Sequence, residues 1–237
     1  MNIEITLPDE SVRTYEKAIT GEEIAFDIGP KLGKDAVAIE INRKLYDTSY
    51  VITENASIKI LTKKDIQSLS ILRHSSAHLL AQAVLNLYPG TLYGVGPDIE
   101  DGFYYDFLFK ENISDADLPK IEKEMLKLSK ANQLFVKSIQ KKPDAMDLFK
   151  NQQFKMELID SADESEGVED SEVSLYSNNE FIDLCRGPHV PNTGFIKHFK
   201  LTRLGGAYWR GDENNSQLQR IYGTSWFNNE DIEQYLT

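Results

Sequence analysis

The only cysteine of this 237-residue chain, Cys185, lies four residues before a histidine, His189, in the stretch FIDLCRGPHVPN. A second pair, His74 and His78, occurs in RHSSAH. If that stretch is helical, its i, i+4 spacing places both imidazoles on one face. Three imidazoles and a thiolate are a ligand set that binds zinc tetrahedrally, or leaves one position open for water. The spacing is also compatible with nucleophilic catalysis, and with a purely structural role.

The structural interpretation is the more frequent one for either pair alone, because helix histidines often hydrogen-bond within a core and a buried cysteine behaves as a small apolar residue. Three of the four histidines and the only cysteine nevertheless fall into these two pairs, which favours one shared site. Asp183 would share a strand face with Cys185. A Cys185 thiolate would need a base, which His74, His78 or His189 could supply. The residues alone predict a hydrolytic or metal-binding site.

Two regions must position these residues. Residues 1 to 62 predict a compact unit with a hairpin over 2–16, a short helix opened by a capping box at Thr20 and Glu23, and further strands at 36–41 and 57–61. This order is typical of a ubiquitin-like β-grasp. No catalytic constellation falls inside it, so a docking or regulatory module is expected.

Residues 63 to 237 predict a larger α+β domain, so the fold class is α+β in two domains. The longest helical pattern, from about Asp65 to Leu87, contains the histidine pair. The remaining pattern predicts strands within 92–109 and at 134–139, helices from about Ser114 and at 143–150, then only strands until a terminal helix from about Asn228. Cys185 falls among those late strands.

The amino-acid composition limits the classes of protein to which this chain can belong. Apolar residues make up 41% and charged residues 27%, as in folded globular proteins. One cysteine excludes an internal disulfide, and neither a signal peptide nor a run of roughly 20 apolar residues is evident. A cytoplasmic protein with no membrane partner is expected. The formal charge of −12 argues against broad binding to nucleic acid, DNA included.

Charge is unevenly placed along the chain. No basic residue lies between Lys155 and Arg186, whereas the next stretch is rich in cations interleaved with Tyr208, Trp209 and Tyr222. This basic run comprises Arg186, Lys197, Lys200, Arg203, Arg210 and Arg220. It predicts either a local docking face for RNA or a solvated surface above buried aromatic side chains.

Several motifs together resemble the N-terminal region of bacterial threonyl-tRNA synthetases, over nearly the full chain. They are HSSAH at 74–78, DGFYYDF at 101–107, DLCRGPHVPNTG at 183–194, GAYWRGDENNSQLQRIYGTSW at 206–226, and the leading β-grasp unit. The resemblance implies a TGS domain at residues 1–62. It implies a tRNA editing domain at residues 63–237, the second additional domain shared with alanyl-tRNA synthetases.

The resemblance also implies roles for individual residues. It predicts a pocket that hydrolyses Ser-tRNA(Thr) through an activated water, with the tRNA acceptor end carrying serine as partner. The implied editing residues are His74, His78, Lys155, Asp183, Cys185 and His189. The implied substrate-binding residues are Tyr105, as a wall of the serine pocket, with Arg186, Tyr208 and Arg210. Zinc bound by His74, His78, Cys185 and His189 is possible by analogy with the alanine-editing relatives.

The sequence lacks motifs of a class II aminoacylation core. ATP, a structural zinc and dimerisation are therefore expected of a full-length parent, and no ligase activity is expected of these residues alone. A fragment and a stand-alone editing factor both fit. Two other functions stay open: a metal-dependent esterase that needs no RNA, and an RNA-docking module without turnover.

Overall fold

The computed structural model describes residues 2–169 and 171–237. The chain divides into two compact units. The first extends to Ile71 and includes Gly187–Pro191, and the second comprises Leu72–Arg186 and Asn192–Thr237. The expected domain boundary after residue 62 stays a prediction. Within the described part of the chain, no helix is long and apolar enough to cross a membrane.

The first unit is built on a five-stranded sheet with the strand order β2-β1-β7-β4-β5. Its strands are β1 (Ile3–Thr6), β2 (Val12–Tyr15), β4 (Ala36–Ile41), β5 (Lys44–Asp47) and β7 (Ala56–Thr62). The central pair, β1 and β7, is parallel, and the other pairs are antiparallel. A small second pair joins β3 (Ile19–Thr20) to β6 (Val51–Ile52). This order confirms the expected β-grasp.

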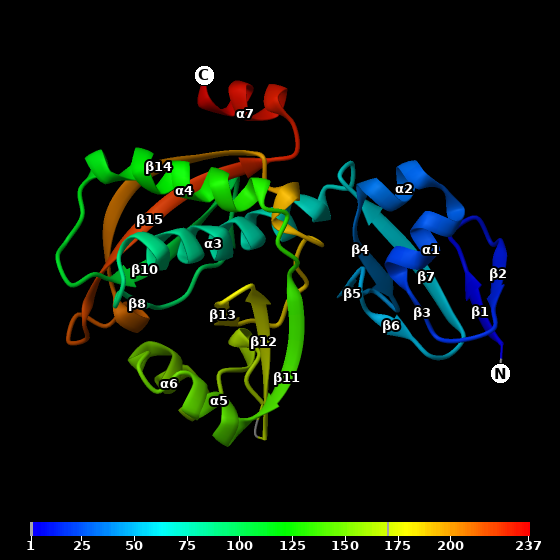
Figure 1. The fold of residues 1–237 in the computed structure, drawn as a ribbon, viewed down its shortest axis with the longest axis horizontal. Helices are drawn as coiled ribbons and strands as arrows, with labels where there is room; N and C mark the ends of the chain where they lie inside the picture. Colours follow the sequence, from blue (N-terminus) through cyan, green and yellow to red (C-terminus); the bar gives the residue numbers. More distant parts are fainter. Residues whose placement is uncertain (1, 170) are drawn as a thin grey trace. The chain divides into compact units, whose positions relative to one another are not determined.

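Two short helices, α1 (Gly21–Ile28) and α2 (Pro30–Asp35), complete the first unit (Figure 1). The predicted capping box opens α1: Thr20 Oγ1 accepts from the Glu23 backbone N–H at 3.2 Å, and Glu23 Oε2 accepts from the Thr20 N–H at 2.8 Å. Ile24 of α1 is fully buried among isoleucines of the sheet. That core contains Ile3, Ile5, Ile24, Ile39, Ile52 and Ile58.

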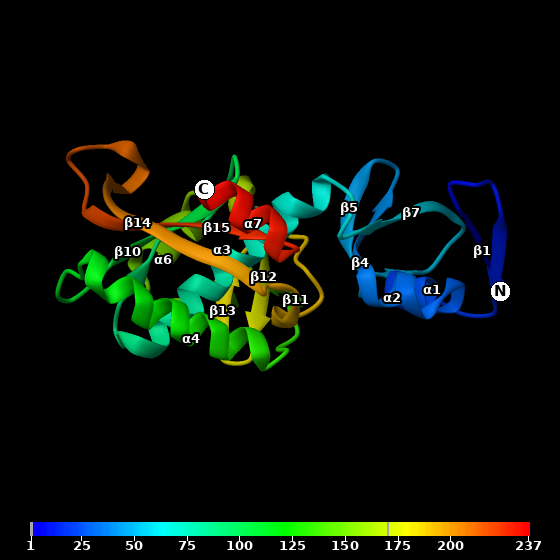
Figure 2. The ribbon, with the colours of Figure 1, turned by 90° about the horizontal axis from the view of Figure 1, so that it is seen from above.

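The second unit contains a larger sheet with the order β14-β15-β10-β8, in which β9 also pairs with β10. These strands are β8 (Leu92–Tyr93), β9 (Asp98–Ile99), β10 (Gly102–Leu108), β14 (His198–Tyr208) and β15 (Gln217–Trp226). The long helix α3 (Gln67–Leu87) and the helix α4 (Leu118–Lys130) run alongside this sheet in both views (Figures 1 and 2). Apolar side chains of α3, including Leu72, Leu79 and Leu80, are fully buried.

A smaller antiparallel sheet carries the cysteine region. It has the order β11-β12-β13, with β11 (Val136–Lys141), β12 (Glu172–Asn178) and β13 (Phe181–Leu184). The helices α5 (Lys142–Leu148) and α6 (Gln153–Asp160) lie beside it (Figure 1), and α7 (Asn229–Leu236) ends the chain. Cys185 follows β13 directly.

One expected element is wrong. The region after residue 150 was expected to contain only strands before the terminal helix, but residues 153–160 form α6. Phe154, Leu158 and Ile159 are buried at helical spacing. Two helical turns provide too few repeats to establish the period from sequence, so packing decides the conformation. This correction places Lys155 on a helix.

Candidate functional site

The second unit brings three of the predicted site residues together. His74 and His78 lie one turn apart on α3, with ring centroids separated by 5.1 Å. The Sγ atom of Cys185 lies 3.2 Å from His74 Nε2. One ligand atom from each of these residues lies within 4.8 Å of the others. This His/Cys group has the donor chemistry of a zinc site and could hold a metal ion.

Burial controls the electrostatics of the His/Cys group. It lowers the pKa of His74, and the carboxylates of Asp98 and Asp183 only partly oppose that effect. His78 is 2% exposed, and its Nε2 lies 3.7 Å from Asp183 Oδ2. A neutral His74 imidazole keeps a lone pair, which can accept a proton or coordinate a metal.

A buried ion pair lies beside the His/Cys group. Lys155 is fully buried, and its Nζ lies 2.5 Å from Asp183 Oδ1. The same ammonium donates to Gly94 O at 2.6 Å and to the Tyr105 hydroxyl oxygen at 3.0 Å. Tyr105 in turn donates to Asp183 Oδ2 at 2.5 Å. The pair is therefore charge-balanced and supplied with hydrogen bonds, as a buried ion pair must be to be stable.

Aromatic rings surround this network. Tyr105 is fully buried and stacks on Phe107 at a centroid distance of 5.0 Å. Burial, followed by the Asp183 carboxylate, raises the pKa of Tyr105 well above its ordinary value, so its hydroxyl stays protonated and donates. Tyr93 places its ring 4.8 Å from Lys155 Nζ and donates its hydroxyl to Ile182 O. Tyr93 carried no sequence signal as a site residue.

Glu166 is a second group that sequence reasoning missed. Burial, with smaller contributions from Asp183 and Asp163, outweighs the opposing effect of Lys155 and raises the pKa of Glu166 to about 7. In the sequence this residue belongs to an acid-rich stretch that reads as solvated surface. The structure instead gives it an electrostatic interaction with the Lys155–Asp183 pair.

His189 lies on the segment Gly187–Pro191, which groups with the first unit. Its backbone N–H donates to Asp47 Oδ1 at 2.9 Å, which fixes the backbone of this segment. Its membership of the His/Cys group stays a prediction.

The other substrate-binding candidates are spread over the second unit. Arg186 is exposed, and its carbonyl accepts from Lys137 Nζ at 3.1 Å. Tyr208 is exposed at the end of β14. Arg210 follows in a turn and donates to Ser161 Oγ at 2.9 Å, just after the last residue of α6. Tyr105 is the only one of these four that the described contacts join to the Lys155–Asp183 pair.

Two family models match the chain. Residues 3–62 match the TGS domain, and residues 173–222 match the threonyl and alanyl tRNA synthetase second additional domain. The second match includes β13, Cys185 and most of the long strands β14 and β15.

Curated relatives match nearly the whole chain. A threonine–tRNA ligase of Hahella chejuensis is 48% identical over 98% of this chain, and one of Francisella tularensis subsp. novicida is 47% identical over 99%. The chain spans 36% of the length of each of these relatives. Over nearly its whole length the chain is therefore similar to threonine–tRNA ligases, and it carries both a TGS domain and the second additional domain of threonyl- and alanyl-tRNA synthetases.

Proposed function

We propose that this chain is the editing portion of a threonine–tRNA ligase and hydrolyses Ser-tRNA(Thr). The observation that carries the proposal is the convergence of His74, His78 and Cys185 beside the buried pair of Lys155 and Asp183. Asp183 and Cys185 lie in the stretch that matches the second additional domain. The acceptor end of the tRNA, carrying serine, is the proposed substrate. ATP-dependent ligation and dimerisation are properties that we assign to the whole ligase.

The proposed reaction is attack of water on the serine ester carbonyl. A neutral imidazole of the His/Cys group, His74 or His78, takes the proton from the water as the new C–O bond forms. The Lys155 ammonium stabilises the negative charge that develops on the carbonyl oxygen. Collapse of the tetrahedral intermediate breaks the ester bond, and the imidazolium returns its proton to the ribose oxygen that leaves.

Asp183 acts as a positioning residue in this scheme. Its carboxylate forms an ion pair with Lys155, accepts a hydrogen bond from the Tyr105 hydroxyl, and lies 3.7 Å from His78 Nε2. It therefore fixes the ammonium and an imidazole at the same time. Cys185 shapes the pocket and contacts His74 through its Sγ.

Rejection of threonine requires a tight wall. Serine and threonine differ by one methyl group, and a synthetic site distinguishes such pairs by only about 1–3 kcal/mol. A second pocket that admits serine and excludes the methyl group adds the missing selectivity. Tyr105 is our candidate for that wall, because its ring is fully buried and stacked.

Zinc fits the same residues. His74, His78 and Cys185 offer two imidazoles and a thiol, and His189 is the proposed fourth ligand. When bound, zinc lowers the pKa of a coordinated water, which favours hydrolysis. The scheme above needs only the side chains of the chain.

The decisive measurement compares deacylation of Ser-tRNA(Thr) and Thr-tRNA(Thr) by the purified chain. We expect selective loss of serine, and at least about tenfold slower hydrolysis by Cys185→Ala with an unchanged circular dichroism spectrum, because the variant removes the Sγ that contacts the His74 imidazole. Ser225→Ala, which also removes a buried polar atom of this unit, is the matched control. Full activity in folded Cys185→Ala contradicts the proposal.

Two further measurements distinguish this function from the two alternative functions. Hydrolysis of simple serine esters without RNA, abolished by a chelator, indicates a metal-dependent esterase. RNA binding that survives Cys185→Ala, with no turnover by the wild-type chain, indicates a docking module.

A further inference from the structure

Glu166 is an acidic residue of the second unit that the proposed reaction does not use. It is the last residue of the short 3-10 helix η2 (Glu164–Glu166), and it is only partly exposed. Among the described residues it forms no ion pair, whereas Asp183 pairs with Lys155 at 2.5 Å. Glu166 therefore contributes a negative charge to this region that direct contact does not neutralise.

The backbone at Glu166 is fixed against the cysteine of the His/Cys group. Its N–H donates to Asp163 O at 3.1 Å, and the carbonyl oxygen of the next residue, Gly167, accepts from the Ser174 N–H at 2.8 Å. A Cβ at Gly167, whose φ is 81°, would lie 2.9 Å from the carbonyl carbon of Cys185. This close approach holds the backbone of Glu166 one residue away from the Cys185 contact.

The electrostatic interactions of Glu166 reach the buried ion pair. Burial raises its pKa to about 7, Asp183 and Asp163 add to that effect, and the Lys155 ammonium only partly opposes it. Tyr105, whose hydroxyl contacts both members of the Lys155–Asp183 pair, also interacts with the Glu166 carboxylate. The Glu166 carboxylate therefore acts on the same region of the unit as the residues of the proposed reaction.

The charges in this region do not balance. The Lys155 ammonium cancels the Asp183 carboxylate, and burial lowers the pKa of the His74 imidazole and keeps it neutral. Ionised Glu166 then leaves one negative charge in a partly desolvated environment, which is unfavourable until a cation compensates it. A ligand group that is small and carries a single positive charge supplies that compensation.

The proposed substrate carries one such group. The phosphates make the acceptor end of a tRNA anionic, and the α-ammonium of the esterified amino acid is its cation. We propose that Glu166 binds this α-ammonium group and is a specificity-determining residue of the site. Asp183 is less suited to that role, because its carboxylate already contacts Lys155 and Tyr105. The identity of the ester rests on the proposed function, whereas binding of the ammonium does not.

The first test compares two esters of the same tRNA that differ in one group. Ser-tRNA(Thr) carries the α-ammonium, and its deaminated analogue, the glyceryl ester, carries a neutral hydroxyl in that place. We expect Glu166→Gln to raise KM for the serine ester about tenfold, because a charge-assisted hydrogen bond is lost, and to leave KM for the glyceryl ester within about twofold of the wild-type value. Equal effects on both esters, or no effect on either, overturn the proposal.

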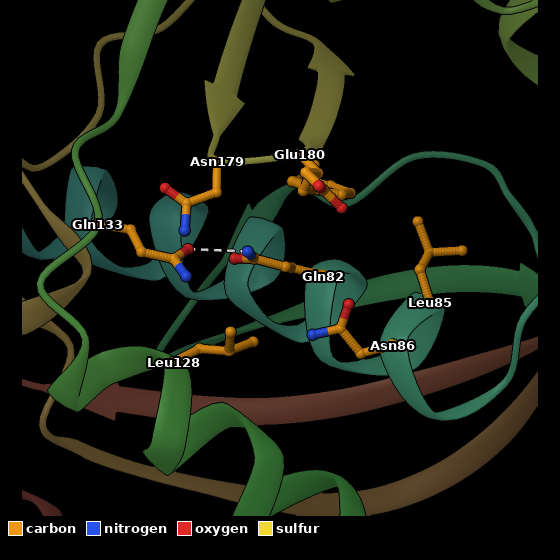
Figure 3. Close-up of a pocket in the computed structure, with 8 residues that line it drawn as sticks. Gln82, Leu85, Asn86, Leu128, Gln133, Asn179 and Glu180 are labelled. Carbon is orange, nitrogen blue, oxygen red and sulfur yellow. Dashed lines mark hydrogen bonds between the residues drawn. The ribbon is translucent and has the colours of Figure 1, made fainter.

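Two other carboxylates of the second unit are matched controls. Glu164 is exposed on the same helix η2, and Glu180 is exposed where it lines a cavity of about 550 Å³ between α3, α4 and the β12–β13 turn (Figure 3). We expect Glu164→Gln and Glu180→Gln to keep the wild-type KM for both esters. If Glu180→Gln loses the preference for the amine and Glu166→Gln keeps it, the ammonium binds in that cavity and the assignment is overturned.

A measurement without RNA separates this assignment from the proposed function. L-Serinamide and glyceramide, which differ in the same amine, are titrated into the chain, and binding is followed by NMR chemical shifts. We expect serinamide to bind at least about fivefold more tightly, and Glu166→Gln to remove the difference.

The outcomes of the two experiments distinguish the two proposals. A preference for serinamide that depends on Glu166, without deacylation of Ser-tRNA(Thr), rejects the proposed function and leaves the ammonium site standing. Deacylation with a preference for the amine that Glu166→Gln does not change rejects the ammonium site alone. If the folded wild-type chain neither binds serinamide nor hydrolyses the serine ester, both proposals are rejected.

Discussion

Lys155 shows how one residue acquires its role from its surroundings. Its ammonium is fully buried and is compensated by Asp183, Gly94 and Tyr105. Sequence resemblance assigned Lys155 to the site, but a lysine in FKMEL gives no local indication of burial. Tyr93 and Glu166 carried no such signal at all, since their roles depend on distant neighbours. At the residue scale, the sequence shows the spacing of the histidines and the cysteine, but it does not show which residue neutralises a buried charge.

Lys155→Met should destabilise the second unit by about 3–5 kcal/mol, because it leaves the Asp183 carboxylate buried without its cation. Tryptophan fluorescence during urea unfolding measures this change, since Trp209 and Trp226 both belong to the second unit. Lys150→Met is the control, because Lys150 is exposed and its ammonium pairs with the exposed Asp147. We expect it to cost less than about 1 kcal/mol. A similar loss of unfolding free energy in both variants would show that the buried pair stabilises the unit no more than an exposed one.

Glu166 should make stability fall as pH rises. Its pKa is about 7 in the folded chain, above the ordinary 4.5, so the folded state holds an extra proton between these values. The resulting penalty is absent below about pH 4.5 and complete above pH 7. We expect Glu166→Gln to stabilise the second unit by about 1–3 kcal/mol at pH 8 and to have little effect at pH 4.5. Urea unfolding midpoints of the wild-type chain and of Glu166→Gln, measured at both pH values, test this prediction. A difference in stability that is the same at both pH values would contradict it.

At the element scale, close contact between β10 and β15 fixes the sheet beneath the site. A Cβ at Gly102 would lie 2.4 Å from the Gly223 carbonyl oxygen, and one at Gly223 would lie 2.5 Å from the Phe103 ring. Register follows from this contact, since Phe103 pairs with Gly223 and Tyr105 with Ile221. The register places Tyr105 on the buried face, where it reaches Asp183. The sequence predicted the strand but not its partner.

Gly102→Ala should destabilise the second unit by about 1–3 kcal/mol, because the new methyl group meets backbone that cannot rotate away. Gly206→Ala is the control in the same sheet, since its Cβ would come no closer than 3.4 Å to Gln217 Nε2. We expect Gly206→Ala to be neutral or slightly stabilising. Thermal unfolding followed by tryptophan fluorescence distinguishes the two. Equal melting temperatures would show that the strands separate without cost.

At the scale of the whole molecule, charge is the property that sequence states most directly. The formal charge is −12, so RNA must be attracted locally. The structure reduces the cations available for this purpose, because Lys200 pairs with Glu122 at 2.9 Å and Arg220 is held by Asp106 through two bonds. Arg186, Lys197, Arg203 and Arg210 lie outside the ion pairs of the described residues, and the Arg203 guanidinium carbon lies 3.6 Å from the centroid of the Tyr222 ring.

tRNA binding should therefore depend only modestly on salt. Four contacts to single-stranded phosphates give a slope of about −3 in a plot of log affinity against log salt concentration. Arg203→Gln should reduce its magnitude by about 0.7, whereas Lys150→Gln should leave it unchanged. Filter binding between about 50 and 200 mM salt measures both values. A slope unaffected by Arg203→Gln would exclude this residue from the RNA contact.

The sequence by itself determined the elements whose signals are local. The capping box of Thr20 and Glu23 predicted α1, and the alternation of apolar and polar residues predicted the hairpin of β1 and β2. The spacing of His74 and His78 predicted that both imidazoles lie on one helix face. These features depend on side chains within a few residues of one another. The pairing of β1 with β7 and the conformation of α6 required tertiary contacts, because short segments adopt the structure that buries their apolar faces.

Only the tertiary structure decided what the site contains. Residues from α3, α6, β10 and β13 meet there across sequence separations of 28 to 111 residues. Burial in that environment pairs Lys155 with Asp183 and raises the pKa of Glu166. Pairing and desolvation are properties of neighbours in space, so no local pattern in the sequence could reveal them.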